Sequence, residues 1–541
     1  MLVDPFLLAA VAAVLFLFYH VINRKYQFFA ERGIPYAKPT FLLGNGASVL
    51  LKKEDLLKNV QRTYNSFPNA KIMGMFDFIK PIMMIRDPDA IKQIGVKDFD
   101  HFVDHTPLFT PADCEDVGTN SLFGNSLFAL RGQKWRDMRA TLSPAFTGSK
   151  MRHMFELVLD CARSTAEFFR EEANAGRTTE YEMKNVFSRF STDVIGSVAF
   201  GIKVDSLREQ DNDFFVKGKA LLNFQNLKTL VTVIMLRSAP KLMHRLNVDI
   251  TSPKMNAYFK DMILDNMKQR EIHGIVRNDM INILMQVQKG ALQHQKDEQD
   301  QKDAGFATVE ESSVGKALNN RVWSENELVA QCFLFFLAGF DTVSTCLTFV
   351  SYELMANPDV QQKLYEEIMA VEKSLDGKPL SYEVLQKMQY LDMVISETLR
   401  LWPPAPFVDR YCVKDYLFDD GQGTKIPIEK GQIIWFPITA LHHDAKYFPD
   451  PDRFDPERFS EQNRPKINPA TYLPFGVGPR NCIGSRFALI EVKAIVYHLV
   501  KNFSLEQGAK SRVPLKLEKS MIAMIVEGGM WLKFTPRDGG K

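Results

Sequence analysis

The chain has 541 residues, of which 45% are hydrophobic and 24% are charged, as is usual for a globular protein with a large core. Its formal net charge of +2 gives no basis for nucleic-acid binding. No Gly/Ser-rich or Pro-rich linker divides the sequence, so we expect one large domain despite the length.

The cysteines are scattered along the chain and form no CxxC pair. This spacing argues against a disulfide scaffold, a zinc site and a four-cysteine iron–sulfur cluster. It fits a reducing compartment. The cysteines are Cys114, Cys161, Cys332, Cys346, Cys412 and Cys482.

The N-terminal segment differs from the rest of the chain. Residues 5–22 are almost wholly apolar, and Arg24 and Lys25 follow them. A helix of this length rises about 27 Å, enough to cross a thin bilayer such as that of the endoplasmic reticulum. A cleaved signal peptide is the alternative, but the basic residues lie on the wrong side of the apolar run and no A-x-A site follows. We therefore predict a membrane signal-anchor over residues 1–24, with the rest of the protein in the cytosol.

Residues 25–40 contain two prolines that interrupt any helix, and we predict a hinge there. The domain would then occupy residues 41–541. A Gly-Asn-Gly sequence at 44–46 suggests the start of a dinucleotide loop, but Val49 holds the third glycine position. We interpret it as a turn, and the chain shows no flavin or nicotinamide site of its own.

Most of residues 130–400 has the 3.6-residue periodicity of helices. The polar, charge-rich stretch 288–324 interrupts this pattern and is interpreted as a solvated loop. Farther along, 425–436 is expected to form a hairpin that turns at Lys430 and Gly431, and 521–526 is expected to pair with 530–534. The predicted fold class is mainly α, with small β-sheets.

Trp135 and Arg139 are four residues apart and therefore share one helix face. An indole N–H and a guanidinium together suit recognition of a carboxylate. An ordinary amphipathic helix with a buried tryptophan is an equal alternative on this evidence alone.

A capping box at 324–327 opens a helix that can run to Asn357. Its apolar part is too short to span a bilayer, so we expect it in the core. Near its middle, Ala338 and the glycine after it would let a flat ligand approach the backbone. The adjacent Asp341 and Thr342 would place a buried acid beside a hydroxyl, a combination that can relay protons.

Glu397 and Arg400 are three residues apart, on a helix that must end before the prolines at 403 and 404. By itself this spacing indicates no more than a common ion pair, which on a surface contributes less than about 1 kcal/mol.

A single cysteine, Cys482, lies in a glycine-rich loop at 475–484, just before an apolar helix predicted over 485–500. Free amide N–H groups at a helix start, together with the helix dipole, favour a thiolate. The arrangement suits a sulfur that serves as an axial ligand of haem iron. A buried structural cysteine is the alternative.

This loop resembles the haem-binding signature FxxGxRxCxG of the cytochrome P450 family at every fixed position. The residues at 397–400 resemble the family's ExxR motif, those at 456–459 its PERF segment, and those at 135–139 its WxxxR pair. Residues 338–343 resemble its oxygen-activation motif [A/G]Gx[D/E]T[T/S], although Val343 stands where a hydroxyl is usual. The remainder resembles insect microsomal members of the clan grouped with vertebrate drug-oxidising enzymes.

The resemblance implies a single large cytochrome P450-type domain that binds haem b, with Cys482 as the thiolate ligand of the iron. It implies a proton relay at Asp341 and Thr342. It implies further roles in binding haem, in contacting substrate and in a buried structural network. The haem contacts would be Trp135, Arg139, Arg410, Phe475, Arg480 and Gly484; the substrate contacts Ala338, Ala405, Pro406, Phe407 and Val408; and the network Glu397, Arg400 and Arg458.

The implied activity is a monooxygenase that inserts one atom of O2 into apolar small molecules, either xenobiotics such as insecticides or endogenous lipids. Electrons would come from NADPH through a separate cytochrome P450 reductase, with cytochrome b5 as a further partner. We expect the enzyme on the endoplasmic reticulum membrane, facing the cytosol. Arg131, Lys134 and Arg136 are candidates for docking an acidic reductase surface.

Two other functions stay open. A haem-thiolate isomerase or dehydratase would need no reductase, but such enzymes tend to lack the acid–threonine pair. A haem sensor without catalytic activity would have no use for proton-relay residues.

Overall fold

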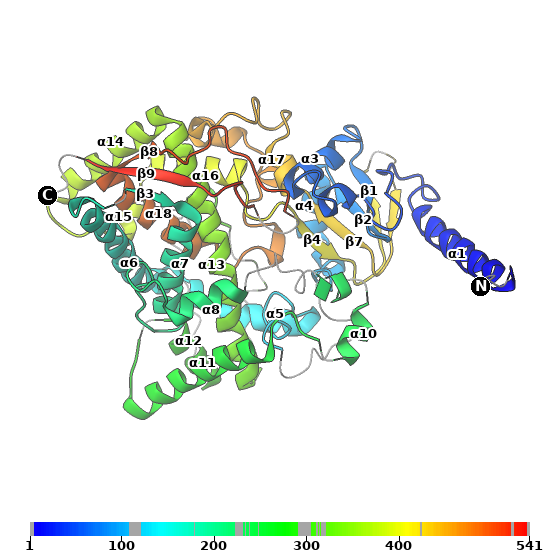
Figure 1. Ribbon diagram of the computed structural model, residues 1–541, viewed down its shortest axis with the longest axis horizontal. Helices are drawn as coiled ribbons and strands as arrows, with labels where there is room; N and C mark the ends of the chain where they lie inside the picture. The colour runs from blue at the N-terminus through cyan, green and yellow to red at the C-terminus, as the bar shows by residue number, and fades with distance from the viewer. Residues whose placement is uncertain are drawn as a thin grey trace.

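The computed structural model describes residues 5–537 except 108–120, 178, 222–230, 233, 237–238, 247, 278, 290–304, 310–311, 313, 315–320, 422, 424 and 521–523. Helices gather around one long central helix, and a small sheet lies on the side that carries the N-terminal helix (Figure 1). This arrangement matches the mainly α fold class with small sheets that the sequence predicts. The core of the predicted loop 288–324, with its charged run at 296–303, lies outside the described residues.

The helices differ widely in length, from single turns to the 32 residues of α13. They are α1 (Pro5–Tyr26), α2 (Ala47–Leu50), α3 (Leu56–Asn65), α4 (Pro88–Lys92), α5 (Gly132–Leu142), α6 (Gly148–Asn174), α7 (Met183–Ala199), α8 (Asp213–Leu221), α10 (Pro240–Arg245), α11 (Pro253–His273), α12 (Met280–Gln288), α13 (Glu325–Ala356), α14 (Pro358–Leu375), α15 (Tyr382–Gln386), α16 (Gln389–Leu401), α17 (Ile438–His442) and α18 (Ser485–Asn502). The strands are β1 (Ile72–Asp77), β2 (Lys80–Ile85), β3 (Glu180–Glu182), β4 (Val408–Tyr411), β5 (Tyr416–Asp419), β6 (Lys425–Ile428), β7 (Ile433–Phe436), β8 (Phe503–Gln507) and β9 (Trp531–Pro536).

Helix α13 crosses the middle of the domain, as predicted (Figure 1). The predicted capping box is present: the Glu327 backbone N–H donates to Ser324 Oγ, and the Ser324 N–H donates to the Glu327 carboxylate at 2.9 Å. Although α13 is long and apolar enough to cross a membrane, 61% of its most apolar window is buried inside the protein. The prediction that it belongs to the core is confirmed.

Helix α7 packs against α13 at very short range. At Gly339, an added Cβ atom would come within 2.8 Å of Ile195 Cδ1 on α7. A larger residue at 339 would force the Ile195 side chain to shift, a constraint that the sequence pattern does not show.

The sheet near the N-terminus has the strand order β1-β2-β7-β4, in which β2 and β7 run parallel. The predicted hairpin over 425–436 is wrong. Both halves are strands, but β6 pairs with β5, whereas β7 pairs with β2 and β4. Every residue of β7 is buried, which suits an interior strand, whereas β6 alternates between exposed and buried residues.

The second predicted strand pair is also wrong. Strand β9 pairs with β8 and β3. Of the segment expected to pair with it, residues 521–523 lie outside the described chain, and Val526 forms an isolated bridge with Leu517. Local alternation of apolar residues predicted β9 itself but not its partners, which are distant in sequence.

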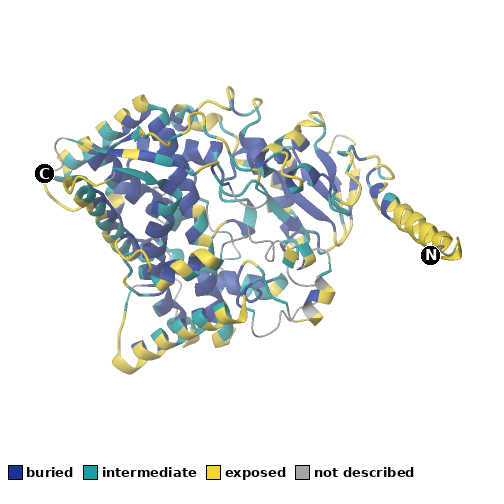
Figure 2. Cartoon of the chain, viewed as in Figure 1, coloured by how far each residue is buried: buried dark blue, intermediate teal, exposed yellow. Residues whose placement is uncertain are grey.

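Helix α1 projects from the domain and is exposed along most of its length (Figure 2). Its last turn is different, because Ile22 and Tyr26 are buried and the Tyr26 hydroxyl donates to the Phe78 carbonyl at 3.2 Å. Phe29 and Ile34 of the following segment are also buried, in the core of the sheet. The segment predicted as a hinge is thus packed on the domain, and the proposed domain boundaries stay predictions.

Glu397 and Arg400 on α16 form a bidentate ion pair with N–O distances of 2.7 and 2.9 Å, and neither side chain is exposed. Arg458 Nε also donates to Glu397, at 3.2 Å, as does the backbone N–H of Asp455, at 2.9 Å. Arg400 in turn donates to the carbonyl of His442 at 2.8 Å. The network joins α16 to the segments that precede the cysteine loop.

Replacing Glu397 with Gln should destabilise the protein by about 3–5 kcal/mol, because the buried guanidinium of Arg400 and the partly buried one of Arg458 lose their anion. Thermal unfolding of the purified protein measures this loss. The matched control is E457Q, which removes an exposed carboxylate paired with Lys363 in the same segment and should change the unfolding temperature little. Equal unfolding temperatures for E397Q and the native protein would refute the structural importance of the network.

Candidate functional site

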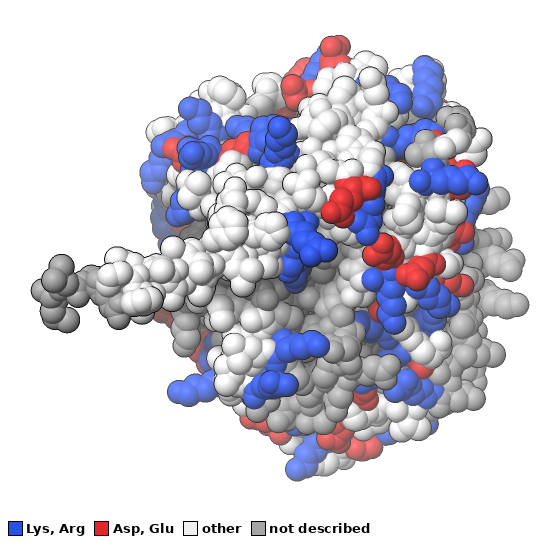
Figure 3. Space-filling view, turned by 90° about the vertical axis from the view of Figure 1, so that its right-hand side faces the viewer, with Lys and Arg blue, Asp and Glu red and all other residues white. Residues whose placement is uncertain are grey.

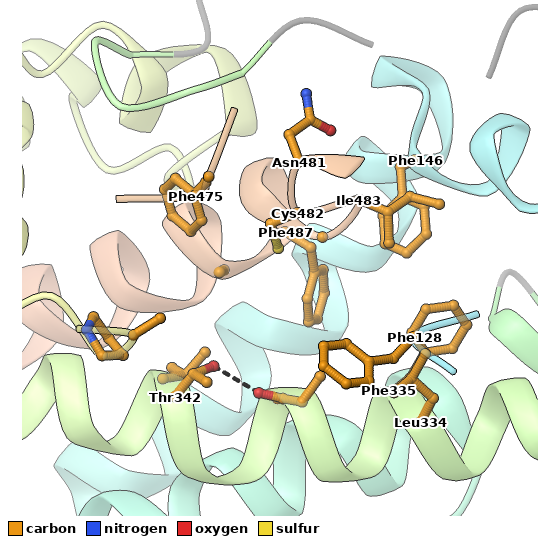
Figure 4. Close-up of a pocket in the computed structure, with 18 of the residues that line it drawn as sticks. Phe128, Phe146, Leu334, Phe335, Thr342, Phe475, Asn481, Cys482, Ile483 and Phe487 are labelled. Carbon is orange, nitrogen blue, oxygen red and sulfur yellow. Dashed lines mark hydrogen bonds between the residues drawn. The ribbon is translucent and has the colours of Figure 1, made fainter. Parts of the chain in front are cut away.

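A cavity of about 420 Å³ lies between α13 and α18 and is lined mainly by apolar side chains. Cys482 lies on one side of it and Thr342 on α13 lies across from it (Figure 4). Phe128, Leu334 and Phe335 lie on the side of Thr342. The structure therefore brings the predicted cysteine loop and the predicted proton-relay helix to one cavity.

The loop that carries Cys482 is held by its own backbone. The N–H of Cys482 donates to the carbonyl of Phe475 at 2.9 Å. Gly476 and Gly478 have φ angles of +80° and +70°, which favour glycine, and any Cβ at Gly478 would collide with the carbonyl oxygen of Gly95. Gly484 is the N-cap of α18 and also lines the cavity.

The Cys482 sulfur is open to the cavity. Burial raises the pKa of this thiol, whereas the Gly484 N–H and the charge of Arg139 lower it. Backbone and arginine therefore favour the thiolate but do not outweigh desolvation. A metal cation at the sulfur would supply the missing stabilisation of the anion.

Arg139 is buried and donates to the loop itself, at 2.8 Å both to the carbonyl oxygen and to the side-chain oxygen of Asn481. It therefore contacts the residue just before Cys482. Trp135, one turn earlier on α5, is buried as well, and both side chains line the cavity.

Arg480 lies over the Trp135 ring, with its guanidinium carbon 4.2 Å from the ring centroid. It donates to the carbonyls of Val103 and Leu130, at 2.8 and 2.6 Å, and lies 3.4 Å from an oxygen of Asp104. Burial lowers the pKa of Arg480 to about 9, because these partners only partly compensate the charge.

Arg410 on β4 is fully buried and donates to the carbonyls of Asp409 and Val477, both at 2.7 Å. Within the described part of the chain its Nε has no hydrogen-bond partner, and burial lowers the pKa of Arg410 to about 10. Arg410 is not among the described residues that line the cavity. It contacts the cysteine loop through Val477.

These side chains fit the propionates of a haem. The site contains three buried cations, Arg139, Arg410 and Arg480. The carboxylates that act on the pKa values of Arg410 and Arg480 are those of Asp104 and Asp409. The carboxylate of Asp409 also has a hydrogen-bond partner, because its Oδ1 lies 2.9 Å from Nδ1 of His105. An anionic group in the cavity would balance the excess positive charge and would lie near Arg139 and Arg480, which line it. The apolar space beside Cys482 would take the macrocycle.

Thr342 faces the cavity, and its hydroxyl donates to the carbonyl of Ala338 one turn earlier at 2.6 Å (Figure 4). The expectation of a buried acid beside it is wrong. The side chain of Asp341 is 42% exposed, lies outside the described cavity lining, and pairs with Lys184 of α7 at 2.8 Å. Adjacent helical residues point about 100° apart, so Thr342 can face the cavity while Asp341 faces α7.

Three of the five predicted substrate contacts line the cavity, namely Ala338, Ala405 and Val408. Pro406 and Phe407 are not among the described lining residues, and their contact with substrate stays a prediction. The Phe407 ring stacks on Trp435 with a centroid distance of 3.6 Å, in the core of the N-terminal sheet.

Two segments with several phenylalanines, 109–128 and 214–224, precede the central helix in the sequence. Phe128 does line the cavity, but 108–120 and 222–230 lie outside the described residues. Phe214 is buried against Phe336, at a centroid distance of 5.1 Å, in ordinary core packing.

Sequence reasoning missed several lining residues: His105, Phe146, Leu334, Phe335, Phe487 and Glu491. Two of these lining residues could have been predicted from their spacing in the sequence. Leu334 and Phe335 precede Ala338 and Thr342 at helical spacing, so they share a face of α13 with predicted site residues.

The chain has been compared with protein families and with characterised relatives. The cytochrome P450 family model matches residues 35–532. The chain is 44% identical to "Probable cytochrome P450 9f2" of Drosophila melanogaster, over 99% of this chain and 100% of that protein. It is 41% identical to "Cytochrome P450 9e2" of Blattella germanica, over 98% and 97% of the two chains, and 34% identical to "Cytochrome P450 6k1" of the same species, over 98% and 96%.

The family model covers the sheet, α13 and the cysteine loop, and the Drosophila relative also covers α1, so the likeness is not confined to one motif. The family implies a haem-thiolate cofactor, which the buried arginines and the open sulfur of Cys482 fit. The chain belongs to the cytochrome P450 family and is a cytochrome P450 monooxygenase with similarity to insect members over its full length.

Proposed function

We propose that this monooxygenase oxidises apolar small molecules that bind in the cavity between Cys482 and Thr342. The observation that carries the proposal is the shared cavity itself, which joins a thiol, a threonine hydroxyl and an apolar wall. Electrons would come from NADPH through a separate reductase, because the sequence has no flavin or nicotinamide site.

When bound, haem b supplies the oxygen chemistry, and Cys482 would be its thiolate ligand and electron donor. Arg139, Arg410 and Arg480 would hold its propionates, and Trp135 would shield them. Phe475 and Gly484 would hold the loop in place, because the Phe475 carbonyl accepts from the Cys482 N–H and Gly484 is the N-cap of α18.

Thr342 would hold a proton inside the cavity. Its hydroxyl now donates to the Ala338 carbonyl, and the same O–H can turn into the cavity while its lone pairs accept from water. Asp341 would contribute from the outer side of α13. Its carboxylate pairs with Lys184, which also donates to Ser344 and Thr345 at 2.8 and 2.7 Å, so Asp341 must leave this cation to reach the cavity.

The substrate class follows from the wall of the cavity. Phe128, Leu334 and Phe335 offer apolar area, and Ile195 adds a branched side chain from α7. Such a surface excludes water and binds by area rather than by directional hydrogen bonds. Xenobiotics such as insecticides therefore suit the site, and endogenous lipids are the second substrate class.

The membrane location is supported by α1 and its surroundings. Its apolar span is 6% buried, and exposed Phe41 packs against Tyr19 with a ring distance of 5.4 Å. The surface at the base of α1 is broadly uncharged, with lysines and arginines at its edges (Figure 3). We propose a single-pass anchor in the endoplasmic reticulum with the domain in the cytosol.

The reductase, with cytochrome b5 as a second donor, would dock on the cytosolic domain. Two of the predicted docking cations already have partners, since Lys134 pairs with Glu327 at 2.7 Å and Arg136 with Asp100 at 2.6 Å. If the reductase docked through Lys134 and Arg136, these cations would have to exchange their present carboxylate partners for carboxylates of the reductase, which costs little free energy at a surface.

One assay distinguishes the proposed monooxygenase from the two alternative functions, a reductase-independent isomerase and a haem sensor. Product formation with NADPH, reductase and O2 supports the monooxygenase reaction on a given substrate. Turnover of a hydroperoxide alone favours the isomerase, and binding without turnover of any substrate favours the sensor.

Replacing Thr342 with Ala should divert NADPH consumption toward hydrogen peroxide, because the cavity loses its hydroxyl proton donor. General acid catalysis typically contributes about 10²–10⁴-fold, so product per NADPH should fall at least tenfold. The ratio of product to peroxide measures this. T342S restores the hydroxyl and should restore the ratio, and unchanged coupling in T342A would refute the relay.

Deleting residues 2–20 should move the protein from the membrane fraction to the soluble fraction. The deletion spares Ile22 and Tyr26, which pack on the domain, so the fold should persist. Sedimentation of expressed protein after carbonate washing measures the partition. Retention of the truncated chain in carbonate-washed membranes would contradict the single-anchor proposal.

A further inference from the structure

The connection between α12 and α13 is mostly polar in sequence, but one short part of it is packed against the domain. Residues 305–307 are partly or fully buried. Ala307 is 3% exposed and belongs to the same hydrophobic core as residues of α16 and α18, and Phe306 packs on that core as well. A loop that only joined two helices through solvent would not need these contacts.

A buried ion pair fixes the backbone of this part. Lys493 of α18 pairs with Asp392 of α16 at 2.9 Å, and the Lys493 side chain is fully buried. The other carboxylate oxygen of Asp392 accepts from the Phe306 N–H at 2.9 Å. Gly305 has a φ of +89°, and an added Cβ there would collide with Asp392 Oδ1. The carboxylate therefore holds the loop at one position, which a glycine at 305 permits.

The ring of Phe306 lies among other aromatic rings. It stacks on Tyr472 with a centroid distance of 5.3 Å and an interplanar angle of 24°. Tyr472 also stacks on His442, again at 5.3 Å. Phe459 lies 5.1 Å from Phe306, and the guanidinium carbon of Arg464 lies 5.0 Å from the Phe306 ring centroid. Such contacts favour one orientation of a ring in addition to burying its area.

Tyr472 connects these rings to the cysteine loop. Leu473, the next residue, donates its N–H at 2.9 Å to Nε2 of His442, the ring on which Tyr472 stacks. Phe475, three residues after Tyr472, accepts from the Cys482 N–H at 2.9 Å. The Phe306 ring therefore packs against the segment that leads directly into the turn around Cys482.

We propose that Phe306 is a positioning residue for Cys482, and that residues 305–307 clamp the segment before the cysteine loop so that the sulfur stays bonded to haem iron. The proposal rests on the haem ligation by Cys482 that the proposed function includes. A bond to the iron needs the sulfur at a fixed place, and packing on the preceding segment opposes its displacement. Neither Phe306 nor Tyr472 is among the described residues that line the cavity, so the clamp acts without touching substrate.

The first test compares F306A with F168A in the full-length holoenzyme. Each change removes a partly buried ring that packs on the same core and has an arginine beside it, Arg464 for Phe306 and Arg208 for Phe168. Phe168, however, lies on α6 and contacts the ring of Phe169. The two variants therefore lose similar packing at different places.

The measurement is the decay of the thiolate Soret band of the reduced carbon monoxide complex in dilute urea. F306A should lose this band about tenfold faster than the native protein, because the segment before the cysteine loop has lost its ring contact. F168A should lose it at the native rate. A native rate in F306A would overturn the proposal, and so would an equal acceleration in F168A, which would show a general loss of stability.

A second readout follows the segment itself. Amide hydrogen exchange of the holoenzyme should show reduced protection of peptides within 472–482 in F306A, because the N–H groups of Leu473 and Cys482 leave their acceptors more often. Peptides of α13 should exchange as in the native protein. Native protection within 472–482 in F306A would contradict the clamp even if the Soret band decayed faster.

A gentler variant covers the case in which F306A fails to fold. G305A keeps the ring but places a Cβ against Asp392 at a φ that disfavours it, so it should displace residues 305–307. The control is G274A at the end of α11, where φ is +62° and no described atom lies within 4 Å of the added Cβ. The thiolate band should decay faster in G305A than in G274A, and equal rates would refute the clamp.

Failure of this inference differs from failure of the proposed function. If the native protein shows no thiolate Soret band, or forms no product with NADPH, reductase and O2, the proposed function fails. If the native protein does both, and F306A and G305A keep the band as long as the native protein does, the clamp alone is wrong.

Discussion

The bond that the rest of this structure supports is the one that Cys482 would make to haem iron. A thiol buried in an apolar cavity resists ionisation, and burial is the dominant influence on the pKa of Cys482. The protein opposes this with the Gly484 N–H and with Arg139, which contacts the preceding Asn481. These contacts prepare an anion whose remaining cost the metal removes.

The same reasoning accounts for the charges around the cavity. Arg410 and Arg480 have pKa values lowered by burial, and Arg410 retains an unpartnered Nε. Uncompensated buried cations destabilise a fold unless an anion joins them. The network around Glu397 shows the complementary design, because there each buried charge has its partner. The charges around Glu397 are thus balanced within the protein itself, whereas those around the cavity would be balanced when a cofactor binds.

The sequence predicted what local pattern determines. The capping box placed the start of α13, and the glycine spacing around Cys482 identified its loop. Pairing between distant segments could not be predicted in this way. Strand β7 lies beside β2, some 350 residues earlier, rather than beside β6, because only the assembled sheet buries all of its side chains.

In the functional site, too, local sequence pattern predicts some features, whereas contacts between distant segments determine others. Thr342 faces the cavity as expected, whereas the environment of Asp341 depends on Lys184, which belongs to another helix and gives no signal in the local sequence. Phe407 follows Ala405 closely, yet the adjoining strand turns its ring onto Trp435. Glu491 looks like any other residue of an amphipathic helix until packing closes around it.

The central claim is thiolate ligation of haem iron by Cys482, and the most direct measurement is the absorption spectrum of the purified protein reduced with dithionite in carbon monoxide. The account predicts the strongly red-shifted Soret band that marks a thiolate opposite the bound gas, and its loss in C482A. Absence of that band in the native protein, or its persistence in C482A, would contradict the account.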